Sequence, residues 1–378
     1  MFYYLSAFAE AALSHRPRTI WNGDFPTRAN FMSDVRRILV IQLRELGDTI
    51  LTTPLFRQLR RIYLHAEIDM VCQRSNRPLL EHHPLISETF ELPRKAGVRD
   101  FLAFASKLRQ RKYDVIVDTQ SLPKTALLTR LAAGRKRLGF RNRGIRNRLC
   151  YTHPYRPPPF EYSSRNKLLL LQDERVDLDD VQLDFCVSDE DKAAAARFRN
   201  EYFQAPVVAI YGVTRFEWRR WPVAKLANIA DRLAERGFQP FLVYGPGEES
   251  IAREIADQMR CEPLIDYAMP SIPVLKEILT GCELLVGNDG GPKHFANAAG
   301  IPTVVVMDGE SAVRWTPANR EDQRVVRPRA DVPRDDVCGN VLDVNTIAEI
   351  DIDAVWKQIE ELAARDLIQL GGSCQQVA

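Results

Sequence analysis

The stretch that decides the fold is Ile38-Leu-Val-Ile-Gln-Leu-Arg-Glu-Leu-Gly-Asp-Thr-Ile-Leu-Thr-Thr-Pro54. Its first four residues form a short apolar run, which is typical of a strand buried in a parallel sheet. A loop follows at 43–47, and apolar residues then recur at helical spacing over 48–63. The stretch therefore predicts a strand, a loop and a helix, the first part of a β-α-β unit.

The same alternation continues along the chain. Further strands are predicted at 66–72, 113–118, 207–211, 240–244, 284–286 and 303–307. Helices are predicted at 101–111, 189–202, 223–236, 248–259, 272–280, 292–299 and 352–364. The pattern pauses at a proline cluster within 154–159. It predicts two α/β domains with parallel sheets, whose ligands bind at the carboxyl ends of the strands.

Composition excludes several classes of protein. The 378 residues include 52 Lys and Arg against 50 Asp and Glu, so the net charge of +2 does not point to a nucleic-acid binder. No apolar run reaches the ~18 residues that a membrane-spanning helix needs. Seven cysteines without a Cys-x-x-Cys pair favour reduced thiols in a cytosol. Residues 1–31 differ from the rest and favour a dispensable or locally packed extension, with a helix at a membrane interface as the alternative.

Two loops that follow predicted strands carry charged residues. Asp48 follows the first strand, where it could cap the next helix, worth about 1 kcal/mol, or act as a general base at the mouth of a cleft. The loop 211–222 carries Arg215, Arg219 and Arg220, which could clamp a diphosphate through paired hydrogen bonds. The alternative for these arginines is a solvated basic loop.

The stretch 287–299 is the strongest candidate for a phosphate-binding loop. Its glycines offer backbone N–H groups at the start of a predicted helix, an end that attracts phosphate. Asp289 places an acid in the turn before the helix, and Lys293 adds a positive charge. His294 lies in the first turn, where a lone histidine is more often structural than catalytic.

A shorter loop, Tyr244-Gly-Pro-Gly-Glu-Glu249, lacks the third glycine of a dinucleotide-binding fingerprint. An acid at Glu248 or Glu249 could accept hydrogen bonds from ribose hydroxyls or cap the following helix. No spacing typical of metal ligands stands out, so we expect a site without a metal or other cofactor.

Residues 119–160 form a block with basic residues and no acid. Its ten members are Lys124, Arg130, Arg135, Lys136, Arg137, Arg141, Arg143, Arg146, Arg148 and Arg156. Such a block favours an anionic partner, namely a phosphorylated glycolipid, a membrane surface or RNA. The alternative is a solvated loop face.

The segments 38–54, 219–222, 245–248 and 287–294 occur in the order seen in bacterial heptosyltransferases. Over residues 36–362 the chain resembles these members of glycosyltransferase family 9. The resemblance implies the GT-B fold, in which two Rossmann-like α/β domains with parallel sheets face each other across a cleft. It implies an N-terminal extension at 1–33, an acceptor-binding domain at 34–188, a nucleotide-sugar-binding domain at 189–350, and at 351–378 a helix returning to the first domain followed by a tail.

The resemblance also implies an activity. Members of the family move heptose from ADP-heptose onto an inner-core acceptor of lipopolysaccharide, with inversion and without a metal. It therefore implies an anionic lipopolysaccharide precursor as partner and no nucleic acid. Together with the basic block 119–160, this predicts a cytoplasmic protein associated peripherally with the inner membrane.

Individual residues carry the resemblance into the site. Asp48 matches the family's catalytic base. The positions expected to bind the donor are Thr214, Arg219, Glu248, Asp289, Gly290, Gly291, Lys293 and His294. Arg219 stands where the family usually has Lys, and Gly290 where it often has Thr. Gln42 stands where the family often has Arg or Lys. Arg44, which could compensate for Gln42, is expected to bind the acceptor. Independently of the resemblance, the basic block 119–160 predicts that Arg141, Arg143 and Arg146 also bind an anionic acceptor.

Three other readings remain open from the sequence. A relative that modifies autotransporter proteins would use the same donor on a protein hydroxyl. A nucleotide-sugar epimerase would use the same two-domain scaffold for other chemistry. A nucleotide-binding or RNA-binding protein would use the block 119–160 and no catalysis.

Overall fold

The computed structural model describes residues 34–141, 149–158, 160–173, 175–214, 216–328 and 346–370. The N-terminal extension 1–33, Arg143, Arg146, Arg215 and the end of the predicted tail lie outside the described residues. Within these ranges no helix combines the length and apolar character needed to cross a bilayer.

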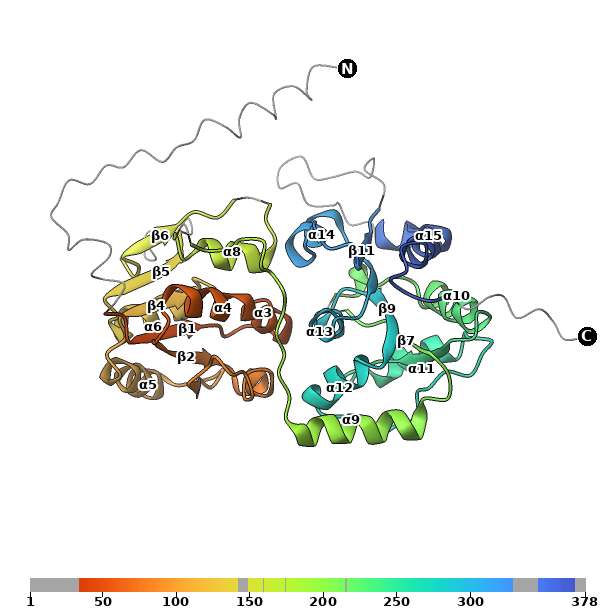
Figure 1. Ribbon diagram of the computed structural model, residues 1–378, viewed down its shortest axis with the longest axis horizontal. Coiled ribbons are helices and arrows are strands. Elements are labelled where there is room, and N and C mark those ends of the chain that lie inside the picture. The colour runs from red at the N-terminus through yellow and green to blue at the C-terminus, as the bar shows by residue number, and fades with distance from the viewer. Residues whose placement is uncertain are drawn as a thin grey trace, which may run out of the picture. The chain divides into compact units, whose positions relative to one another are not determined.

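The first lobe is built on a sheet of six parallel strands in the order β3-β2-β1-β4-β5-β6 (Figure 1). The strands are β1 (Arg37–Ile41), β2 (Glu67–Cys72), β3 (Glu88–Glu91), β4 (Val115–Asp118), β5 (Lys136–Phe140) and β6 (His153–Tyr155). The helices of this lobe are α3 (Leu46–Ile50), α4 (Thr53–Ile62), α5 (Val98–Gln110), α6 (Pro123–Ala132) and α8 (Ser163–Leu169), with a 3-10 turn η1 (Arg74–Leu79). Strand β1 lies at the centre because residues 38–41 are all apolar and fully buried.

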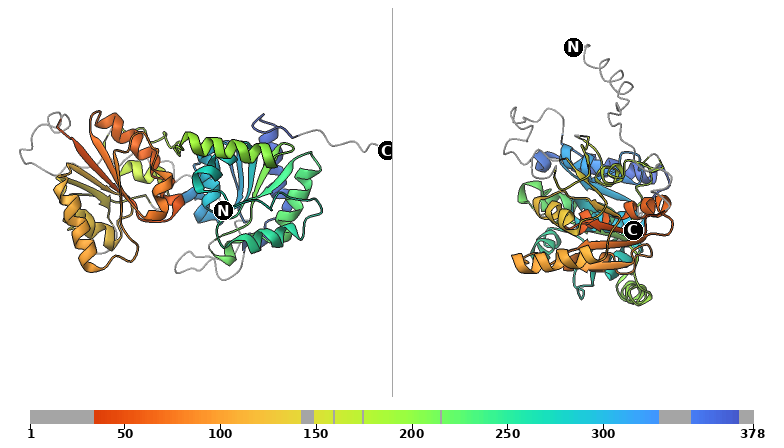
Figure 2. Two further views of the ribbon diagram at one scale, coloured as in Figure 1. Left: turned by 90° about the horizontal axis from the view of Figure 1, so that it is seen from below. Right: turned by 90° about the vertical axis from the view of Figure 1, so that its left-hand side faces the viewer.

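The second lobe is built on five parallel strands in the order β11-β10-β9-β7-β8. They are β7 (Val207–Tyr211), β8 (Gln239–Leu242), β9 (Cys282–Asn288), β10 (Thr303–Val306) and β11 (Gln323–Val326). The helices are α9 (Asp189–Tyr202), α10 (Val223–Ala234), α11 (Glu249–Ala256), α12 (Ile272–Leu279), α13 (Gly291–Ala299), α14 (Gly309–Trp315) and α15 (Ile352–Ala363), with 3-10 turns η2 (Glu217–Arg219) and η3 (Thr346–Glu349). Helices cover both faces of each sheet (Figure 2), so the prediction of two parallel α/β sheets is confirmed.

The helix predicted over 48–63 is two helices. Helix α3 ends at Ile50 and α4 begins at Thr53, because Pro54 has no N–H to continue the ladder of hydrogen bonds. Two hydroxyls replace backbone donors at the break. Thr53 Oγ1 donates to the Ile50 carbonyl at 2.7 Å, and Thr52 Oγ1 donates to the Asp48 carbonyl at 2.9 Å. Asp48 lies in the first turn of α3 and is not its N-cap, which is Glu45. The interpretation of Asp48 as a helix cap is therefore wrong.

Helix α15 packs on the second sheet, against β10, β11 and α10. Its residues Val355, Ile359 and Leu362 are fully buried in the apolar core of the second lobe. This placement corrects the expectation that the helix returns to the first domain.

The basic block 119–160 is not a loop. Its described part contains α6, β5 and β6, so its basic residues are spread over a helix and two strands of the first lobe. The sequence analysis missed the strands β3, β6 and β11, which lie at sheet edges, and β5, which lies between β4 and β6. They mix charged and polar residues with few apolar ones, so no apolar run marks them.

Candidate active site

A cavity of about 990 Å³ is lined by residues of both lobes. The first lobe contributes the loop after β1, the start of α3, and the loops before α5 and α6. The second lobe contributes the loop after β7, the loop after β8, and the start of α13. These are loops at the carboxyl ends of parallel strands, where ligands of such sheets bind.

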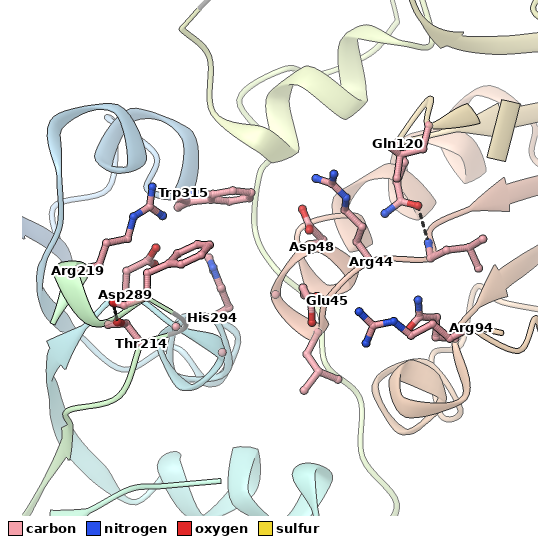
Figure 3. Close-up of a pocket in the computed structure, with 18 of the residues that line it drawn as sticks. Arg44, Glu45, Asp48, Arg94, Gln120, Thr214, Arg219, Asp289, His294 and Trp315 are labelled. Carbon is pink, nitrogen blue, oxygen red and sulfur yellow. Dashed lines mark hydrogen bonds between the residues drawn. The ribbon is translucent and has the colours of Figure 1, made fainter. Parts of the chain in front are cut away.

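Asp48 lies in this cavity on the first-lobe wall (Figure 3). Two contacts hold the start of α3, and with it Asp48, in position. Gly47, just before it, lies so close to His294 of α13 that a Cβ at position 47 would be 2.8 Å from the His294 ring. Only glycine allows the start of α3 to approach α13 this closely.

The second contact is made by Lys167, on α8, whose Nζ donates to the Asp48 carbonyl at 2.8 Å. That carbonyl accepts no helical hydrogen bond from the Thr52 N–H, which donates to the Thr49 carbonyl instead. It accepts from the Thr52 hydroxyl and, with its second lone pair, from Lys167. Burial lowers the pKa of Lys167 to about 8, with the nearby Asp48 opposing the shift. Sequence analysis missed this lysine because it lies far from Asp48 in sequence and in no recognisable motif.

Arg219 lies at the end of η2 on the opposite wall. Its guanidinium stands over the Trp218 ring at 4.6 Å and the Phe216 ring at 5.6 Å, and its Nε lies 3.4 Å from the Asp308 carboxylate. These contacts orient a cation toward the cavity, where planar hydrogen-bonding groups suit a diphosphate.

The start of α13 faces the same space. Gly290 and Gly291 both line the cavity. Position 290 requires glycine because its backbone passes so close to Tyr211 that a Cβ would be 2.5 Å from the tyrosine ring. Asp289 precedes them, and burial raises the pKa of its carboxyl while Lys293 and Arg219 oppose the rise. The backbone N–H groups at this helix start form an anion-binding end.

Lys293 does not line the cavity. Its ammonium is fully buried and donates to the Trp315 carbonyl at 2.7 Å and to Thr316 Oγ1 at 2.8 Å, and it lies 3.8 Å from the Asp289 carboxylate. The contact of Lys293 with the donor stays a prediction, and in the structure its side chain lies beneath α13 and ties that helix to the end of α14. Burial lowers its pKa to about 8.

His294 lines the cavity although it is buried. Burial lowers its pKa well below the ordinary value, and the nearby Lys293 and Lys167 ammonium groups lower it further. The imidazole is therefore neutral near pH 7. It packs edge-on against Trp315, a cavity residue that sequence analysis did not single out and that extends toward Asp48 and Arg44 (Figure 3).

Two other predicted donor residues reach the cavity. Glu248 lines the cavity, and one carboxylate oxygen accepts the Gly245 N–H at 2.8 Å, so the acid closes its own loop. Glu248 is the N-cap residue of α11, but its side chain makes no capping hydrogen bond. Thr214 lines the cavity with its hydroxyl donating to the Phe216 carbonyl at 2.6 Å.

The cations on the first-lobe wall differ from those predicted. Arg44 lines the cavity as expected, but Arg141 is not among the lining residues. Arg94 and Lys124 line it instead, and Lys124 Nζ donates to the Pro93 and Arg94 carbonyls at 3.3 Å each. Arg94 was missed because it lies in a charge-rich loop before α5 with no motif around it.

Gln42, which stands at the basic position of the family, is buried beneath this wall. Its Oε1 accepts a hydrogen bond from Thr119 Oγ1, and it does not line the cavity. Among the residues that the structure describes, no three His, Cys, Asp or Glu side chains group in a way that could hold a metal ion.

Comparison with known proteins matches this arrangement. Residues 101–337 match the family model described as glycosyltransferase family 9 (heptosyltransferase), so the chain belongs to that family. It is 26% identical over 291 residues to lipopolysaccharide heptosyltransferase 3 of Escherichia coli strain K12, covering 73% of this chain and 83% of the relative.

Solved structures agree on the fold. A family 9 glycosyltransferase from Veillonella parvula has a TM-score of 0.75 at 20% identity, covering 88% of this chain and 99% of that structure. ADP-heptose lipopolysaccharide heptosyltransferase II of E. coli has a TM-score of 0.69 at 21% identity, covering 87% and 99%. The fold is therefore GT-B, and the protein is a glycosyltransferase of the heptosyltransferase family.

Proposed function

We propose that this protein transfers heptose from ADP-heptose to an inner-core acceptor of lipopolysaccharide, with inversion and with Asp48 as general base. The observation that carries the proposal is that Asp48 shares one cavity with the predicted donor residues Glu248, Asp289, Gly290 and Gly291. The relatives supply the substrates by their names, since the similar proteins are lipopolysaccharide heptosyltransferases and ADP-heptose is the donor named for one of the solved structures.

The chemistry follows from the two walls. The Asp48 carboxylate takes the proton from an acceptor hydroxyl as that oxygen attacks the anomeric carbon. The bond to the diphosphate breaks on the opposite face of the sugar, so the configuration inverts. Arg219 and the N–H groups at the start of α13 stabilise the negative charge that grows on the departing ADP. One acceptor site remains on Glu248 for a ribose hydroxyl.

The first-lobe wall suits an anionic acceptor. Arg44 and Arg94 are exposed at the cavity, and Lys124 stands beside them. The proposal therefore assigns acceptor binding to these three cations in place of Arg141, while Arg143 and Arg146 lie outside the described residues. We further propose that the enzyme is cytoplasmic and works peripherally at the inner membrane. Residues 34–188 would bind the acceptor, and residues 189–350 would bind the donor.

The test is incubation of the purified protein with ADP-heptose and a panel of truncated core oligosaccharides. Mass spectrometry should find one heptose added to one member of the panel, with ADP released only when that acceptor is present. An altered sugar nucleotide without an acceptor would indicate an epimerase instead. Heptose added to a polypeptide and to no oligosaccharide would indicate a protein-modifying enzyme.

A further inference from the structure

The outer face of α5 and α6 exposes large aliphatic side chains to solvent. Val98 is 77% exposed, Leu102 51% and Leu127 46%. Val98 and Leu102 are four residues apart on α5, so they lie on one side of that helix. Leu127 lies on α6.

The two helices present these residues on a common surface. Helices α5 and α6 contact each other, and their inner side chains enter the same apolar core as Leu39 and Ile41 of β1. Both therefore cover the same face of the first sheet (Figure 1), and their exposed side chains point away from it. We call this surface, with the loop 92–97 before α5, the α5–α6 face.

The charge of the α5–α6 face is strongly one-sided. Asp100 is its one acid. The basic residues of the loop 92–97 and the two helices are Arg94, Lys95, Arg99, Lys107, Arg109, Lys124 and Arg130, of which Lys107 lies over the Phe90 ring of β3. Aliphatic side chains among basic ones are the composition of surfaces that lie on anionic bilayers, where the apolar groups enter the headgroup region and the cations meet the lipid phosphates.

The α5–α6 face also begins at the cavity. Arg94 lies four residues before Val98, and Lys124 lies three residues before Leu127, and both cations line the cavity. Lys124 joins the two helix starts by donating to the Pro93 and Arg94 carbonyls. A bilayer against this face would therefore lie beside the wall assigned to the acceptor.

We propose that the α5–α6 face docks on an anionic lipid bilayer and presents the first-lobe wall of the cavity to a lipid-anchored acceptor. The inference rests on the proposed function for the identity of the substrate in that bilayer. The binding itself depends only on the surface described here. The phosphates that it recognises are those of the lipid headgroups.

The experiment measures co-sedimentation of the full chain with vesicles of phosphatidylethanolamine and phosphatidylglycerol. The test variant is Val98→Ser, Leu102→Ser and Leu127→Ser combined. The matched control is Leu64→Ser, Met269→Ser and Leu367→Ser, which removes three exposed apolar side chains outside this face, with exposed fractions of 66%, 42% and 36%. A second variant, Lys95→Gln with Arg99→Gln, removes charge without touching a residue that lines the cavity.

We expect the test variant and the charge variant each to lower vesicle partitioning by about tenfold, and the control to bind like wild type. Binding by wild type should weaken as salt rises and should be lost on phosphatidylcholine vesicles. Unchanged partitioning of the test variant, or equal loss in the control, would overturn the proposal. Dissociation of a wild-type dimer by the test variant in sedimentation velocity, with vesicle binding intact, would assign the face to a second copy instead.

Activity separates this proposal from the proposed function. The test variant should transfer heptose to a water-soluble truncated oligosaccharide at the wild-type rate, because none of its three positions lines the cavity. A wild-type protein that docks through this face yet transfers no heptose would remove the proposed function and leave the docking surface standing. Normal transfer by a wild-type protein that binds no vesicles would overturn the docking surface and support the proposed function.

Discussion

The two walls of the cavity hold their charged side chains in different ways. On the second-lobe wall, Asp289 is flanked by Lys293 and Arg219, and Arg219 is itself stacked on Trp218 and paired with Asp308. On the first-lobe wall, Arg44 and Arg94 are exposed. One wall is preorganised, whereas the other offers exposed charge.

The difference matches what each wall is proposed to bind. A departing diphosphate develops charge at one place, and fixed donors stabilise it without reorganising. An anionic acceptor brought by a membrane is attracted over longer distances, for which exposed cations are sufficient and geometry matters less. Substitutions on the second-lobe wall should therefore have larger and less salt-dependent effects than substitutions of the first-lobe cations. Asp48, the proposed base on the first-lobe wall, should have the largest effect of all.

Asp48→Asn should lower the transfer rate by about a thousandfold, because the amide cannot accept the proton from the acceptor hydroxyl. The affinity for ADP, measured by calorimetry, should stay within about threefold of wild type. The matched control is Glu45→Gln, which neutralises another acid of the same cavity wall and should leave the rate near wild type. Near-normal turnover of Asp48→Asn would remove Asp48 from the mechanism.

Two buried lysines beside the cavity should make stability depend on pH. Burial lowers the pKa of Lys167 to about 8 from 10.5, so the unfolded chain holds this proton more tightly than the folded one. Losing the proton favours the folded state, and Lys167 therefore adds stability as the pH rises from its folded pKa to its unfolded pKa.

Relative to Lys167→Met, the wild-type free energy of unfolding should rise by on the order of 3 kcal/mol across that window. The measurement is urea unfolding of both proteins at several pH values. Lys293→Met, which removes the corresponding lysine beneath the second-lobe wall, should reveal the same window, because its pKa is also lowered to about 8. A difference in stability that stays flat with pH would show that burial does not lower the pKa of Lys167.

The sequence predicted the parts of the fold that apolar runs mark. The strands at 38–41, 207–211 and 303–307 are confirmed, because a strand buried on both faces must be apolar throughout. The strands β3, β5, β6 and β11 could not be found in this way, since partly exposed strands tolerate polar side chains at most positions.

The site was predictable only where a loop follows a marked strand. Asp48 lies in the helix that follows β1, and Asp289 and Gly290 follow β9 directly, so their places in the cavity could be inferred. Lys293 follows the same strand, but the rotation of α13 turns its side chain beneath the helix, which a motif does not reveal. Lys167 meets Asp48 through tertiary packing alone.

Arg219→Ala should weaken ADP binding by about 1.5–3 kcal/mol, the usual cost of losing a charge-assisted hydrogen bond. Calorimetry with ADP measures it, and high salt should change the loss little because the cation is held in place. The matched control is Arg220→Ala, the next residue along the chain, which is not among the cavity residues. If Arg220→Ala weakens ADP binding and Arg219→Ala does not, the assignment along the loop is displaced by one residue.

The smallest effects should come from the exposed cations, where the two walls contrast most. Arg44→Ser and Arg94→Ser should each raise the acceptor Michaelis constant about two- to fivefold, which corresponds to the ~0.5–1 kcal/mol of an exposed ionic contact. Binding of ADP should not change, and the effect should fade as salt rises, because salt screens exposed charges most strongly.

Arg141→Ser is the matched control, since Arg141 is exposed in the same lobe but does not line the cavity. A larger effect from Arg141→Ser than from Arg94→Ser would move the acceptor away from this wall and back toward β5. An effect of Arg94→Ser that persists in high salt would mean that Arg94 makes a fixed, desolvated contact, and the contrast between the walls would fail.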